Sequence, residues 1–138
     1  MHPTDHRGFT LMELIIIIGI LGTIMLIGAP SMSRFIGSNR LAGATNIVAG
    51  DLRYARSLAA SQRKSYEFRN TTTGYTVVCL SPARTVLTRT LQSGVTFAAL
   101  DTTTFYAWGL TESSVLTLQK DGHSRIVRMN STGQVTRD

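Results

Sequence analysis

The chain has little of what catalytic and metal sites are usually built from. It holds one cysteine, Cys79, so no disulfide can form within the chain. Cys79 lies in an apolar, strand-like run, which predicts a small buried core residue. The three histidines, His2, His6 and His123, are scattered. No residues are spaced as a metal site and no glycine-rich phosphate loop precedes a helix, so we predict no enzyme, no metal site and no cofactor.

Acidic side chains are also scarce. The chain has 8 Asp and Glu against 14 Lys and Arg, a net charge of +6. Residues 30–138 carry 13 basic and 6 acidic side chains, or +7 (13 − 6). Such an excess is typical of proteins that contact nucleic acid or an anionic membrane surface. It also favours solubility and orientation at a membrane, and charge alone leaves these alternatives open.

One long apolar run stands out. Residues 9–29 are predominantly apolar, and Glu13 carries the only charge among them. At about 1.5 Å per residue, a helix of this length spans roughly the 30 Å hydrocarbon core of a bilayer. An ionised Glu13 would cost a few kcal/mol in lipid unless it is paired. We consider pairing with the free α-amino group of a neighbouring subunit, or a polar residue tolerated inside a helix bundle.

The start of this run resembles the processing motif of the type IV pilin superfamily. The motif is a glycine, a hydrophobic residue and then T-L-x-E, and residues 8–13 read G-F-T-L-M-E. The resemblance implies cleavage after Gly8 by a prepilin peptidase, N-methylation of the new terminus at Phe9, and a subunit-registering role for Glu13. Pro30 falls where these proteins carry a helix-kinking proline. A secretory signal peptide fits poorly, because the run is too long and lacks a small-x-small cleavage site.

An amphipathic stretch follows, from residue 30 to about residue 64. Small apolar residues recur there at helical spacing, most clearly Val48, Leu52, Ala55 and Ala59. We expect one helix over residues 9–64, broken or kinked at Pro30, because proline lacks a backbone donor and clashes with the preceding turn. Glycines weaken a helix by roughly 1 kcal/mol each, which predicts local melting at Gly37, Gly43 and Gly50.

Residues 65–138 change to short strand-like runs. We expect strands at 65–69, 75–80, 85–91, 95–98, 104–108, 115–120, 124–130 and 134–136. The pair Asp121-Gly122 predicts a two-residue hairpin turn. Threonine-rich residues 71–73 and 102–104 are expected in loops.

The predicted fold class is α+β. A long N-terminal helix, transmembrane in its first half, packs on a C-terminal antiparallel sheet, as the type IV pilin resemblance also implies. The predicted parts are a leader (1–8), a transmembrane and assembly helix (9–29), its amphipathic continuation (30–64) and the sheet domain (65–138).

Two further segments resemble the GspH/FimT branch of minor pilins and pseudopilins. Residues 51–60, D-L-R-Y-A-R-S-L-A-A, resemble its L-x-x-A-R-S-x-A pattern. Residues 125–136, R-I-V-R-M-N-S-T-G-Q-V-T, resemble its closing strand, turn and strand. The branch often has Arg after the turn glycine, whereas this chain has Gln134.

Basic residues gather around this C-terminal hairpin: Lys120, Arg125, Arg128 and Arg137. We treat them as candidates for binding double-stranded DNA, with a solvated sheet surface as the alternative. Arg125 and Arg128 point to opposite faces of a regular strand, so they share a patch only across an edge or a bulge.

The resemblance implies a subunit that spans the inner membrane once and then assembles with other pilins. The product is a pilus or pseudopilus in the periplasm or at the cell surface. Two roles stay open. One is a tip subunit that binds DNA for natural transformation, as the FimT resemblance suggests. The other is a structural subunit of a type II secretion system, or one that initiates a pilus.

Overall fold

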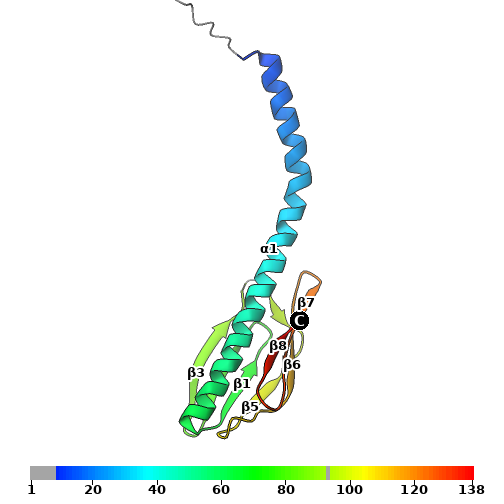
Figure 1. Ribbon diagram of the computed structural model, residues 1–138. Coiled ribbons are helices and arrows are strands. Elements are labelled where there is room, and N and C mark those ends of the chain that lie inside the picture. Colours follow the sequence, from blue (N-terminus) through cyan, green and yellow to red (C-terminus); the bar gives the residue numbers. More distant parts are fainter. Residues whose placement is uncertain (1–8, 93) are drawn as a thin grey trace, which may run out of the picture. The chain divides into compact units, whose positions relative to one another are not determined.

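The computed structural model describes residues 9–92 and 94–138, leaving out the side chains of residues 27–31 and 34. The predicted leader, residues 1–8, lies outside this range. The described part begins with one long helix, α1 (Leu11–Gln62) (Figure 1). Its strands are β1 (Tyr66–Asn70), β2 (Gly74–Leu80), β3 (Ala83–Thr90), β4 (Thr96–Phe97), β5 (Thr102–Phe105), β6 (Ser114–Lys120), β7 (His123–Met129) and β8 (Val135–Arg137). The chain divides into two compact units, and the boundary lies between Ile36 and Gly37.

The helix runs without interruption through Pro30 and three glycines. Of the two alternatives expected at Pro30, a break or a kink, the break is absent, and the expected melting at Gly37, Gly43 and Gly50 is wrong. Packing stabilises helices in proteins more than intrinsic propensity does.

The strands form two sheets, where we expected one. Both are four-stranded and antiparallel, in the orders β3-β2-β1-β5 and β4-β6-β7-β8. The split arises because β5 returns to pair with β1, while the next long strand, β6, pairs with β4 and β7. An isolated bridge between Phe105 and Thr111 follows β5.

The threonine-rich segment 102–104 is a strand and not the expected loop. Thr102, Thr103 and Thr104 lie in β5, opposite residues of β1. β-Branched side chains suit this pleated environment, and the long-range pairing decides the outcome. The turn comes later than expected, where the Gly109 amide donates to the Tyr106 carbonyl at 2.9 Å. The other predicted strands are present within two residues at each end.

A face of small residues on α1 forms the centre of the core. The predicted positions along this face are buried. They are Leu41, Ala44, Val48, Leu52, Ala55 and Ala59. Large side chains from both sheets complete the core: Tyr66, Phe68, Tyr75, Phe105, Leu116, Leu118, Val127 and Met129. Cys79 is buried with them, as expected.

A polar contact attaches the β3 side of the first sheet to α1. Asp51 on the helix accepts hydrogen bonds from the Tyr75 hydroxyl at 2.6 Å and from Arg89 Nε at 2.7 Å. Burial, followed by the hydrogen bond to Asp51, raises the pKa of Tyr75 above its usual value of 10.0. Folding therefore favours the protonated phenol, and this contribution to stability is lost as the pH rises above about 10.

Replacing Tyr75 by Phe should change how stability depends on pH. At pH 7 the Tyr75→Phe variant loses one hydrogen bond and should unfold more easily by about 1 kcal/mol. Above pH 10 its stability should fall less steeply than that of the wild type, because Phe has no proton to lose. Urea unfolding of the full chain in detergent micelles at pH 7 and at pH 10.5 measures both effects.

Tyr54→Phe is the matched control, since Tyr54 lies on α1 and is exposed. It should change the free energy of unfolding by less than about 0.5 kcal/mol. Equal pH slopes for Tyr75→Phe and the wild type would contradict this account of the Asp51 contact.

Candidate nucleic-acid interface and assembly residues

Two arginines of α1 hold the C-terminal hairpin, β7–β8, against the helix. Arg53 Nη2 donates to the Val135 carbonyl at 3.1 Å. Arg56 donates from Nε to the Gly109 carbonyl at 3.4 Å and from Nη1 to the Gly133 carbonyl at 3.3 Å. The sequence did not predict these contacts, because Arg53 and Arg56 lie off the apolar stripe and their partners are distant along the chain.

Gly133 is required where Arg56 meets the hairpin turn. Its φ is +79°, and the Arg56 guanidinium occupies the space that a Cβ would take. The Gly133 amide donates to the Asn130 carbonyl at 2.9 Å. The backbone amide of Gln134, the residue after the turn glycine, donates to Asn130 Oδ1 at 2.8 Å. The two segments that resemble the GspH/FimT branch therefore contact each other through Arg56 and Gly133.

Lys120 is the most enclosed of the predicted DNA-binding residues. Its side chain is 10% exposed and its Nζ lies 3.3 Å from Asp121 Oδ2. Gly94, with φ +81°, leaves room for the lysine Nζ. Asp121 and Gly122 both have positive φ, as the predicted two-residue turn requires.

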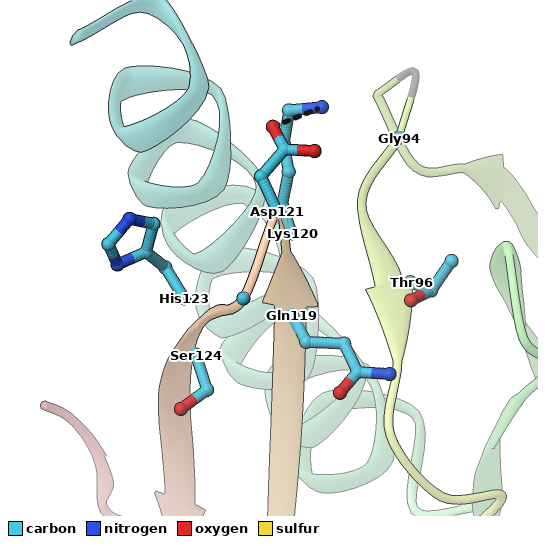
Figure 2. A pocket seen from close by; sticks show the side chains of 8 residues that line it. Gly94, Thr96, Gln119, Lys120, Asp121, His123 and Ser124 are labelled. Atoms are coloured by element: carbon cyan, nitrogen blue, oxygen red, sulfur yellow. Dashed lines mark ion pairs between the residues drawn. The ribbon is translucent and has the colours of Figure 1, made fainter. Parts of the chain in front are cut away.

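A polar hollow of about 400 Å³ opens beside this turn (Figure 2). Figure 2 shows Lys120 and Asp121 paired at its rim, with His123 extending on the side of the helix. Thr96, Gln119 and Ser124 come from adjacent strands, because Gln119 pairs with both of the others in register. Lys120 is thus committed to the fold and offers little charge to a partner.

The other three predicted residues divide between the two faces of their sheet. Arg125 comes two and four residues before the buried Val127 and Met129 of β7, and so lies on the same, helix-facing side of the strand. Arg137 pairs in register with Val127 and also lies on this side, where its guanidinium contacts Asn46 of α1. Arg125 and Arg137 are therefore diagonal neighbours on one face.

Arg128 lies on the opposite face. Its Nε forms an ion pair with Asp138 Oδ2 at 3.2 Å, and both side chains are more than half exposed. The register between β6, β7 and β8 is regular, so no bulge brings Arg128 to the side of Arg125. Among the described contacts Arg125 has no hydrogen-bond or ion-pair partner, and it is exposed.

Four of the other eight basic side chains in residues 37–138 are occupied within the fold. Arg69 pairs with Glu67, and Arg89 with Asp51. Arg53 and Arg56 bind backbone carbonyls. The number of basic residues in the sequence therefore overstates the number of basic side chains that are free to bind a ligand.

Glu13, one of the two predicted assembly residues, lies in the first turn of α1. Thr10 caps this helix, because the Glu13 amide donates to Thr10 Oγ1 at 3.2 Å. The T-x-x-E spacing is that of a capping box, and Glu13 sits in the first turn, where the helix dipole favours a carboxylate. Phe9 is 77% exposed. Gly8 and the Pro30 side chain lie outside the described residues.

Two features are absent from the part of the chain that the structure describes. None of its helices is both long and apolar enough to cross a membrane. The expected membrane segment, residues 9–29, continues beyond Leu26 into residues whose side chains are not described. Nor do three metal-ligating side chains gather anywhere in residues 9–92 and 94–138.

Removing the Arg56 side chain should loosen the hairpin. Arg56→Ala loses charged hydrogen bonds to two loop carbonyls, and we expect its free energy of unfolding to fall by about 2 kcal/mol. Arg40→Ala is the control, since Arg40 is exposed on the same helix, and it should cost less than about 0.5 kcal/mol. Urea unfolding of the full chain in micelles compares them. An equal loss of unfolding free energy in the two variants would show that the bonds from Arg56 to the two carbonyls do not stabilise the fold.

Comparison with known proteins agrees with this architecture. A family model described as type II transport protein GspH matches residues 44–133. Among solved structures, the chain is similar to the type IV minor pilin FimU of Pseudomonas aeruginosa strain PAO1. The TM-score is 0.64 at 20% sequence identity, over 75% of this chain and 92% of FimU. That similarity establishes the fold.

No curated protein matches the sequence. The family match nevertheless spans well over half of the chain and includes both the Arg56 segment and the Gly133 turn that it contacts. The chain therefore belongs to the GspH family of the type IV pilin superfamily and is a minor pilin or pseudopilin.

Proposed function

We propose that the chain is cleaved after Gly8, held in the inner membrane by residues 9–29, and then assembled through this helix with other pilins. The observation that carries the proposal is the exposure of the apolar side chains at the start of α1. From Phe9 to Leu26 the large apolar residues are 39% to 79% exposed. A continuous apolar surface of this kind needs a cover. Lipid provides it before assembly, and neighbouring helices provide it in the fibre.

Glu13 registers one subunit against the next in this proposal. Its carboxylate stands among exposed apolar side chains, where an ionised group is tolerated only when it is paired. Cleavage after Gly8 creates an α-amino group at Phe9. A neighbouring subunit can bring this group to Glu13.

The variant Glu13→Ala tests registration separately from processing. It should still be cleaved, so mass spectrometry should find a chain that begins at Phe9 and carries one added methyl group. Its incorporation into fibres should fall severalfold, because the charge pair with the neighbour is lost. Immunoblotting of sheared fibres against the membrane fraction measures incorporation.

Thr23→Ala serves as the control on the same helix. Thr23 is polar and uncharged, and its hydroxyl donates to the Ile20 carbonyl at 2.7 Å within the helix. It should assemble like the wild type. An intact leader in the wild-type protein, or wild-type incorporation of Glu13→Ala, would contradict the proposal.

A second role, weak binding of double-stranded DNA, is favoured by the pair Arg125 and Arg137. Arg125 is exposed and unpaired among the described residues. Arg137 binds the uncharged Asn46, so its positive charge is not neutralised there. Two guanidinium groups on one face suit contacts with neighbouring phosphates. Lys120 and Arg128 contribute less, because each pairs with an aspartate.

Arg125→Ala should weaken this binding and reduce its salt dependence. Each lost phosphate contact should lower the log–log slope of affinity against salt by about 0.9. Arg128→Ala removes the same charge from the opposite face and should leave the slope unchanged. Fluorescence anisotropy of a labelled duplex with the full chain in micelles measures both. Absent binding at low salt, or equal effects of the two variants, would favour the structural role in a pilus or a type II secretion system.

A further inference from the structure

A tight turn after β5 presents the chain's one tryptophan to solvent. Trp108 is 70% exposed. Its ring is stacked on that of Tyr106, with the ring centroids 5.1 Å apart and the planes 2° from parallel. A large apolar side chain gains nothing from this exposure in the isolated domain, since burial is what stabilises it.

The surrounding contacts hold this turn in place. The Tyr106 amide donates to the Leu110 carbonyl at 2.9 Å, and the Tyr106 hydroxyl donates to Glu112 Oε1 at 3.0 Å. The Gly109 carbonyl accepts the bond from Arg56 described above. Trp108 is thus presented on a constrained loop, which lowers the entropy lost when a ligand stacks on it.

A basic side chain lies beside the tryptophan. Arg63, Trp108, Ala60 and Ala107 line an open hollow of about 370 Å³. Arg63 follows the last residue of α1 with φ +51°, and the next amide, that of Lys64, bonds back to the Ala59 carbonyl at 3.3 Å. Glycine is the usual residue at this helix-terminating position, because it adopts positive φ without steric cost.

The chain therefore carries an arginine where its backbone favours glycine. Arg63 is exposed and has no hydrogen-bond or ion-pair partner among the described residues. A strained residue beside an exposed aromatic ring points to a function in binding, because neither feature stabilises the fold.

The chemistry of the hollow fits a nucleotide of a single strand. The flat face of the Trp108 ring can stack on a base, and the methyl groups of the two alanines can contact the edge of that base. The Arg63 guanidinium can bind the phosphate. Arg63 is the one basic residue that lines the hollow among the described residues, and the carboxylate of Glu112 is engaged by Tyr106. A duplex does not fit, because its bases are already stacked on one another.

We propose that Trp108 and Arg63 form a binding site for single-stranded nucleic acid, in which one base stacks on Trp108 and a neighbouring phosphate contacts Arg63. The site shares no residue with the Arg125 and Arg137 face and does not depend on it. A protein partner or an uncharged glycan could also use an exposed tryptophan, but the basic side chain beside it favours a polyanion.

The single tryptophan makes the site directly observable. Titration of the full chain in detergent micelles with a twelve-residue oligothymidylate should quench the fluorescence of Trp108. An abasic strand of the same length has the same phosphates but no bases. It should bind roughly tenfold more weakly and leave the fluorescence unchanged, because stacking is lost.

Arg63→Gly separates binding from folding. Glycine suits the positive φ at this position, so the variant should be at least as stable as the wild type in urea. Its affinity for oligothymidylate should fall about fivefold, with a shallower salt dependence by about 0.7 in log–log slope. Trp108→Ala, followed by anisotropy of a labelled strand, should weaken binding about tenfold. Leu110→Ala is the control, because Leu110 is exposed on the same loop.

Three results would overturn the proposal. Equal affinity for the abasic strand would reduce the interaction to charge alone. Quenching of Trp108 by maltoheptaose, with none by oligothymidylate, would make the hollow a carbohydrate site. Loss of oligothymidylate binding in Arg125→Ala but not in Arg63→Gly would assign the strand to the hairpin face. Loss of duplex binding in Arg125→Ala with unchanged Trp108 quenching would support two separate sites.

Discussion

Two sheets pack against one face of a single helix, and this constraint decides which residues α1 carries. Ala44, Ala49, Ala55 and Ala59 are fully buried there. Small side chains let both sheets approach the helix closely, and the sheets supply the large residues that fill the core. Interiors packed to this density tolerate neither cavities nor extra volume. The packing of the two sheets therefore requires the small side chains on this face. In the sequence alone, alanines give only a weak indication of a buried helix face.

The same constraint determines where the charges lie. Thr45 is the one buried polar residue described on α1, and its hydroxyl donates to the Leu41 carbonyl within the helix. The polar contacts from α1 to the sheets therefore come from its flanks. Asp51 contacts the first sheet by accepting hydrogen bonds from Tyr75 and Arg89. Arg53 and Arg56 donate hydrogen bonds to backbone carbonyls of the second sheet and of the turns at its end. A basic excess that is typical of nucleic-acid binding in the sequence is therefore partly structural, because six of the basic side chains are engaged by ion pairs or backbone carbonyls.

Local patterns predicted the local structure well. Helical spacing gave the buried face of α1, and alternation with turn residues located most of the strands. Apart from the expected melting of α1 at its glycines, the errors concern partners that are distant along the chain. Thr102–Phe105 became a strand through pairing with β1, and the strands divided into two sheets. The bond from Arg56 to Gly133 joins residues 77 positions apart. No periodicity within either segment reveals such a contact, although both segments had been recognised separately.

The two candidate ligand sites can be separated because α1 is long. Arg137 contacts the helix at Asn46, whereas Arg63 follows its last residue, Gln62. At about 1.5 Å per residue these points lie roughly 25 Å apart along the helix axis. Over that distance, and without shared partners, the effects of substitutions should add. Each site can therefore be tested by mutation without disturbing the other. Arg56 is the exception, since it holds both the Gly109 turn and the Gly133 turn.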